Sequence, residues 1–194
     1  MAKNDQQDSF EKHLSANHSR MTDLVKFAET KNAALLTFCS VWMGSIIVML
    51  RSADELPMGY RTAFLVVLPF LAIAAVITLI SFLPRLLHHY HRPAEASNNL
   101  LYFSDVAKIS TDRFGEALRE RYFPSEGQSA TEAYLDDLAL QAAIQAKIAQ
   151  RKFTFFNNAG RLVLASFICM AIPPVVWTFK LVWTAAINLV DVGS

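Results

Sequence analysis

Three long stretches of the chain carry no charged residue, and their length restricts what the chain can fold into. They cover residues 33–50, 62–83 and 162–179, which are 18, 22 and 18 residues long. A bilayer core is about 30 Å thick and a helix rises about 1.5 Å per residue, so about 20 apolar residues cross it. Most buried helices of soluble proteins are shorter than this. The sequence therefore predicts an all-α membrane protein with about three transmembrane helices.

The overall composition agrees with a membrane chain and excludes several other classes. Of the 194 residues, 53% are hydrophobic and 18% are charged, whereas about 25% of the residues in a soluble domain are charged. This balance excludes a disordered, collagen-like or disulfide-stapled chain. The formal net charge of +1 excludes a nucleic-acid binder that acts through overall positive charge.

Lysine and arginine are distributed unevenly between the segments that flank the spans. Residues 1–32 carry five, residues 51–61 carry two, residues 84–161 carry ten, and none follows Lys180. Cytoplasmic loops of membrane proteins are enriched in these residues. The distribution predicts that the N-terminus and residues 84–161 are cytoplasmic, and that the C-terminal tail lies on the other side of the membrane.

The spans divide the chain into four segments. We expect a cytoplasmic amphipathic helix at 1–32, a transmembrane hairpin at 33–83, a cytoplasmic helical region at 84–161, and a third span with an outer tail at 162–194. Residues 180–190 are too few to cross the membrane again. They either continue the third helix or lie at the outer interface.

Two amphipathic helices are predicted in the cytoplasmic region. The first covers about residues 97–122, where apolar residues recur every three to five positions. Ser129 and Glu132 have the spacing of a capping box that opens the second helix. No breaker precedes Gly160, so the second helix is expected to run directly into the third span. The resulting bundle is thin for an independent core, which favours self-association into a homo-oligomer.

The sequence contains none of the common enzyme signatures: no GxxxxGK loop, GxGxxG, HExxH or GxSxG. We therefore expect no enzyme activity and no cofactor. The histidine cluster at 88–91 has no further metal ligands at a recognisable spacing, so it is interpreted as part of an interfacial belt. Cys39 and Cys169 fall inside predicted spans and are interpreted as packing residues.

The first span has a face of small and polar residues, formed by Thr37, Ser40 and Gly44 at helical spacing. Small residues allow membrane helices to pack closely, which is the interpretation that this spacing favours. The same face can line the water-filled pore of an oligomer. Both interpretations stay open.

A second polar group is expected at the cytoplasmic ends of the first and third spans, where Lys31, Arg151 and Lys152 fall. One interpretation is an ordinary belt of basic side chains that reach toward the membrane interface. The other is an anion site, because lysine and arginine bind phosphates.

Several segments, taken together, resemble the transmembrane effectors of the Pycsar family. These are LVKFAETKNAALL at 24–36, LPRLL at 83–87, NNLLYFSDVAKIS at 98–110 and IQAKIAQRKFTFFNNA at 144–159. Their order and spacing make the combination more specific than any one of them. The resemblance covers about residues 20–180.

The resemblance implies an antiphage effector in the bacterial inner membrane, which acts beside an enzyme that makes a nucleotide signal. In Pycsar the enzyme is a pyrimidine cyclase, and cyclic CMP or cyclic UMP triggers membrane impairment. In the similar Hailong system, a nucleotidyltransferase makes DNA oligomers that hold a tetrameric channel shut. The resemblance places the following candidates for ligand binding or gating: Lys31, Asn99, Phe103, Asp105, Arg151 and Lys152.

Two functions from different classes follow. The first is an oligomeric channel, with a tetramer as one arrangement, that a nucleotide signal controls and that depolarises the cell and arrests growth. The second is a membrane anchor or scaffold that recruits a soluble partner through its cytoplasmic helices. Asp105 has an alternative role as well, because it can pair with Arg151 or Lys152 as a structural bridge.

Overall fold

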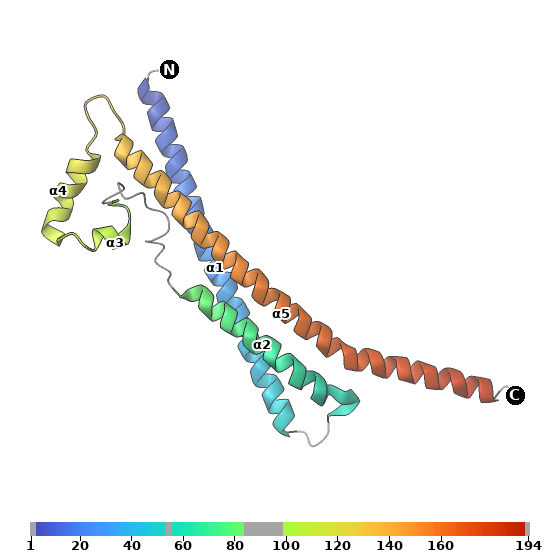
Figure 1. Cartoon of the computed structure of the whole chain (residues 1–194). Coiled ribbons are helices and arrows are strands. Elements are labelled where there is room, and N and C mark those ends of the chain that lie inside the picture. Colours follow the sequence, from blue (N-terminus) through green and yellow to red (C-terminus); the bar gives the residue numbers. More distant parts are fainter. Residues whose placement is uncertain (1–2, 53–55, 84–98, 193–194) are drawn as a thin grey trace. The chain divides into compact units, whose positions relative to one another are not determined.

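The computed structural model describes residues 3–52, 56–83 and 99–192, and all regular secondary structure in these ranges is helical (Figure 1). The all-α prediction is therefore confirmed for the described residues. The elements are α1 (Lys3–Ser52), the short 3-10 helix η1 (Pro57–Gly59), α2 (Tyr60–Phe82), α3 (Phe103–Val106), α4 (Thr111–Tyr122) and α5 (Glu132–Val192).

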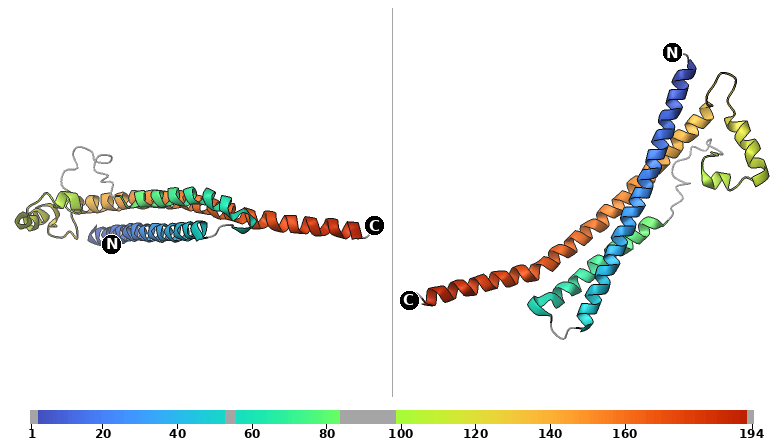
Figure 2. Two further views of the ribbon diagram at one scale, coloured as in Figure 1. Left: turned by 90° about the horizontal axis from the view of Figure 1, so that it is seen from below. Right: turned by 180° about the vertical axis from the view of Figure 1, so that it is seen from behind.

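Three of these helices, α1, α2 and α5, are long and apolar enough to cross a membrane, which confirms the three predicted spans. Figure 2 shows each of them as an unbroken ribbon from two further sides. Helices suit the bilayer because their backbone hydrogen bonds are made within the segment itself. α5 stays helical through Gly160 and through Pro173 and Pro174. Residues 180–190 are thus a continuation of the third helix.

The chain divides into two compact units. The polar unit comprises residues 1–28 and 84–152, and the membrane unit comprises residues 29–83 and 153–194. Both α1 and α5 are divided between the units, with one part of each helix in the polar unit and the other part in the membrane unit. α2 belongs to the membrane unit alone.

The core of the membrane unit is built by all three of its helices. It contains Cys39 and Ile46 from α1, a row of residues from α2 that includes Val67, and Ala159 and Val163 from α5. The buried face of α2 ends in small residues, and its buried Thr78 donates a hydrogen bond to the carbonyl of Ala74. Small side chains at these positions let neighbouring helices approach closely.

The polar unit contains the first half of α1, the helices α3 and α4, and the beginning of α5. The amide of Gln7 on α1 donates to the carbonyl of Ala130, just before α5 begins. Buried apolar side chains from the start of α5 form much of its core, among them Leu135, Leu138 and Ala142.

Two local predictions in this unit were wrong. The single helix expected at 97–122 is two helices, α3 and α4, separated by residues 107–110. Ser110 is extended and precedes Thr111 and Asp112, residue types that favour a helix start over a helix interior. The capping box at Ser129 is also absent, because α5 begins at Glu132. The hydroxyl of Thr131 accepts the hydrogen bond from the backbone N–H of Tyr134 instead, at 3.2 Å.

Candidate functional site

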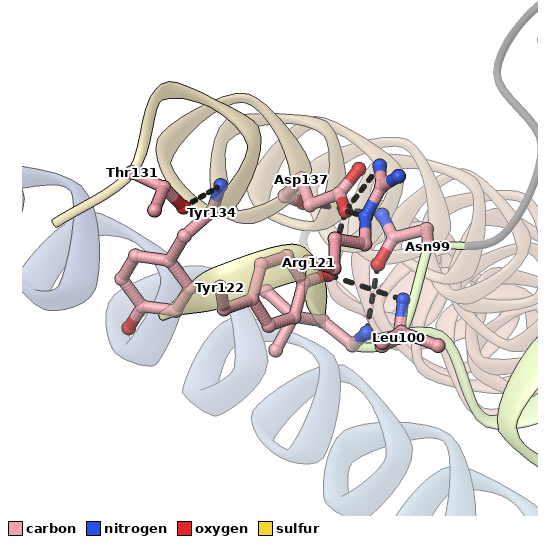
Figure 3. A network of polar contacts seen from close by, with 8 residues as sticks. Asn99, Leu100, Arg121, Tyr122, Thr131, Tyr134 and Asp137 are labelled. Atoms are coloured by element: carbon pink, nitrogen blue, oxygen red, sulfur yellow. Dashed lines mark hydrogen bonds and ion pairs between the residues drawn. The ribbon is translucent and has the colours of Figure 1, made fainter. Parts of the chain in front are cut away.

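The carboxylate of Asp137 is the centre of a polar network in the polar unit (Figure 3). Asp137 lies in the second turn of α5 and is 7% exposed. The hydroxyl of Tyr122 donates to its Oδ2 atom at 2.6 Å. The Nε and Nη2 atoms of Arg121 approach the same oxygen at 2.8 Å each. The carboxylate thus ties the last turn of α4 to the start of α5.

A third segment joins this network through Asn99, which is 3% exposed. Its side-chain amide donates to the backbone carbonyl of Asp137 at 3.3 Å, and its Oδ1 atom accepts from the N–H of Leu101 at 2.8 Å. The N–H of Leu100 donates to the hydroxyl of Tyr122 at 3.1 Å. Residues 99–101, α4 and α5 are therefore held together by one set of hydrogen bonds.

The ionisation of the network follows from its burial and its short contacts. Burial raises the pKa of Tyr122 to about 12, and the hydrogen bond to Asp137 acts in the same direction. The hydrogen bond to Asp137 also raises the pKa of Arg121. At neutral pH the phenol is thus a neutral donor to the carboxylate, and the guanidinium supplies the compensating positive charge.

Alkaline pH is expected to weaken the network through Tyr122. An unperturbed tyrosine has a pKa of about 10. Because the folded-state pKa is higher, the contribution of Tyr122 to stability is complete below about pH 10 and is lost as the pH rises toward 12. We expect Tyr122→Phe to remove this part of the alkaline fall in Tm, measured by thermal unfolding in detergent between about pH 8 and about pH 11. Tyr134→Phe, at the neighbouring ring, is the control that keeps the fall, and an equal alkaline fall in Tyr122→Phe would contradict the assignment.

Three of the residues predicted from the resemblance lie in or near this part of the polar unit. Asn99 belongs to the network itself. Asp105 is 4% exposed and forms a salt bridge with Lys108 at 3.2 Å. Phe103 is 66% exposed, and its ring centroid lies 5.0 Å from that of Tyr102.

The predicted basic residues divide between the two units. In the membrane unit, the Nζ atom of Lys31 lies 5.9 Å and 5.4 Å from the ring centroids of Phe153 and Phe156. Such contacts stabilise a cation where water is scarce. Arg151 and Lys152 are half-buried residues of the polar unit. A single anion site formed by the three basic residues stays a prediction.

The small face of the first span is exposed, and no residue of the described ranges covers it. Thr37, Ser40 and Gly44 are all exposed. The hydroxyls of Thr37 and Ser40 donate to the carbonyls one turn earlier, at 3.1 Å and 2.9 Å. A Cβ atom added at Gly44 would meet nothing within 4 Å. The face is therefore open to a partner, to lipid or to water.

Sequence reasoning did not identify Arg121, Tyr122 and Asp137 as a site. Local spacing gives no signal for Asp137, because helical geometry sets it about 100° from Leu138 and about 200° from Leu135, yet the structure leaves it 7% exposed. A carboxylate is rarely buried without a partner. The partner, Arg121, is far enough away in sequence that only the fold reveals it.

The metal prediction can be tested only in part. Across residues 3–52, 56–83 and 99–192, no three histidine, cysteine or acidic side chains gather as a metal site would require. The histidine cluster at 88–91 lies outside the described residues.

Comparison with known proteins gives one consistent result. The family described as the Pycsar effector protein domain matches residues 13–179. A curated relative, the Pycsar effector protein RsPycTM of a Rhizobium species, is 54% identical over 167 residues, which cover 86% of this chain and 95% of the relative. No solved structure matches the chain.

Proposed function

The chain belongs to the Pycsar effector family, and from this membership we propose that it is an oligomeric membrane channel controlled by a cyclic pyrimidine nucleotide. As a family member it is an antiphage defence effector in a membrane. The finer proposal is that a partner cyclase makes the nucleotide on infection, and that the channel then depolarises the bacterial inner membrane and arrests growth. In this proposal the polar unit is cytoplasmic, as the distribution of lysine and arginine predicts.

The observation that carries the proposal is the uncovered face of α1 at Thr37, Ser40 and Gly44. A channel assembled from copies of one chain needs a surface that the chain leaves open to line the pore, and hydroxyl groups are polar groups that can face the water in it. Two of the three residues offer hydroxyl oxygens, and Gly44 leaves room beside the helix. The hydroxyls already donate within the helix, so their free acceptor positions can face water.

The two longest helices supply a route from signal to channel. α1 and α5 each run without interruption from the polar unit into the membrane unit. A helix transmits a displacement along its axis because its backbone hydrogen bonds resist stretching. A nucleotide bound in the polar unit can therefore bias the channel, provided that it binds the open and closed states with different affinities.

The experiment is ion flux from liposomes that contain the purified full-length chain and a trapped potassium-sensitive dye. We expect flux to change on addition of cyclic CMP or cyclic UMP and not on addition of cyclic AMP. Short DNA oligomers form a separate arm, whose success would assign the signal to a nucleotidyltransferase instead. If the liposomes show no ion flux with any ligand or without one, and a soluble protein co-purifies with the chain at a fixed ratio, the result favours the scaffold function over the channel.

Arg151 and Lys152 on α5 give a prediction for the response of ion flux to the nucleotide. We expect Arg151→Ala or Lys152→Ala to raise the nucleotide concentration for half-maximal flux by about tenfold, because a charge-assisted hydrogen bond to a phosphate is lost. Lys147→Ala, an exposed lysine on the same helix, is the matched control. Membrane insertion should not change in any variant. An unchanged response in both test variants would contradict a phosphate site at these positions.

A further inference from the structure

The half of α1 that lies in the polar unit has a shallow, open groove along one side. Its volume is about 560 Å³. The lining residues are Ala16, Ser19, Arg20, Asp23, Leu24 and Phe27. All six of these described residues come from α1.

Large apolar side chains in this groove are exposed, whereas a helix face that contacts only water typically carries polar residues. Leu24 is 37% exposed and Phe27 is 52% exposed, and Phe10 lies 54% exposed two turns before the groove. The buried Ala28, one turn after Leu24 on the same helix, marks the end of this exposed surface. Exposed apolar groups in a row, beside polar ones, are typical of a protein interface.

The groove also carries charges of both signs. Arg20 makes no ion pair with any residue in the ranges that the structure describes. Asp23 pairs with Lys26 at 3.3 Å, but both side chains are about 70% exposed. Such an exposed pair contributes little stability and is readily exchanged for another partner. The groove therefore offers one cation and one anion that remain available to a neighbouring molecule.

These charges fit a second copy of the same surface. Copies of the chain inserted into a membrane in one orientation have parallel α1 helices at the same height. Arg20 and Asp23 are three residues apart, a rise of about 4.5 Å, which the long side chain of arginine can bridge. The cation of one copy then meets the anion of the next, while Leu24 and Phe27 cover each other.

We propose that the groove on α1 is the contact surface between neighbouring copies of this chain, with Arg20 of one copy paired to Asp23 of the next. The inference rests on the proposed function, because it names the subunit interface of the oligomeric channel. A contact of this modest size is sufficient because the membrane holds the copies at high effective concentration and already fixes their orientation.

A charge exchange tests the proposed pair. We expect Arg20→Glu alone, or Asp23→Arg alone, to lower the assembled fraction by about fivefold, because each interface gains a like-charge contact. The double variant Arg20→Glu with Asp23→Arg should restore assembly, because the exchanged charges are again complementary between copies. Arg113→Glu makes the same charge change at an exposed residue of α4 and should leave assembly intact. The assembled fraction is measured by native mass spectrometry of the full-length chain from nanodiscs.

The same preparations should be assayed for ion flux, so that the interface and the channel are judged separately. A monomeric parent chain, an unchanged assembly in Arg20→Glu, or a double variant as dissociated as the single ones would overturn the interface. If these outcomes come with normal flux, the channel stands without this interface. If assembly responds to the charges as expected but no sample conducts, the interface stands and the channel function falls.

Discussion

Leucine in place of Gly44 is expected to reduce ion flux by at least about tenfold while leaving the protein folded and inserted. Nothing lies within 4 Å of the position that a Cβ atom would occupy at Gly44, so the chain itself accommodates the larger side chain. Leucine also favours the helix more than glycine does, by nearly 1 kcal/mol. The added bulk therefore acts on whatever faces α1 from outside the chain. In the proposed channel that space is the lumen, and filling it from every subunit blocks the ions.

The control for this experiment enlarges a side chain elsewhere in the membrane unit. Ala72 is an exposed small residue of α2, and Ala72→Leu adds three heavy atoms to a different helix. Flux should stay within about twofold of the parent, because an exposed apolar residue away from the lumen meets lipid. Equal flux in Gly44→Leu and the parent would remove this face of α1 from the lumen. Weaker assembly in Gly44→Leu would instead assign the face to helix packing.

Asp137→Ala is expected to lower the free energy of unfolding of the polar unit by about 2–3 kcal/mol. The substitution leaves the hydroxyl of Tyr122 and the guanidinium of Arg121 without the oxygen to which they donate at 2.6 Å and 2.8 Å. It also removes the negative charge that offsets the partly buried Arg121. Hydrogen exchange of the full-length protein in nanodiscs measures the effect. Faster exchange should appear at residues 99–101 and at the end of α4.

A neighbouring residue provides the comparison. Asp136 is an exposed carboxylate beside Asp137, so Asp136→Ala makes the same chemical change without touching the network. Its hydrogen exchange should match the parent. If Asp137→Ala also matches the parent, the network contributes nothing to holding residues 99–101 and α4 on α5.

The membrane architecture could be predicted from the sequence because the bilayer sets one clear physical condition. A segment without charges and about 20 residues long has few alternatives to a spanning helix, and α2 follows this rule directly. The continuity of α5 followed for a similar reason, since no helix breaker interrupts its approach to the membrane.

The polar unit was harder to predict because its structure depends on contacts between distant residues. The apolar spacing across residues 103–122 suits one helix, yet the chain leaves the helix at 107–110. There the backbone N–H groups of Lys108 and Ile109 donate to carbonyls three residues earlier, and Ser110 is extended. The pairing of Asp137 with Arg121 and Tyr122 joins residues 15 and 16 positions apart. Local spacing carries no information on such a pairing, so sequence reasoning does not reveal the network.

The register of α1 against α5 has a consequence for the order in which the molecule is made. Gln7 meets Ala130, 123 positions later in the chain. Contacts between residues so far apart form late, because the intervening chain must first be synthesised and placed. During translation, the first half of α1 therefore gains this partner only after α2, α3 and α4 have been synthesised.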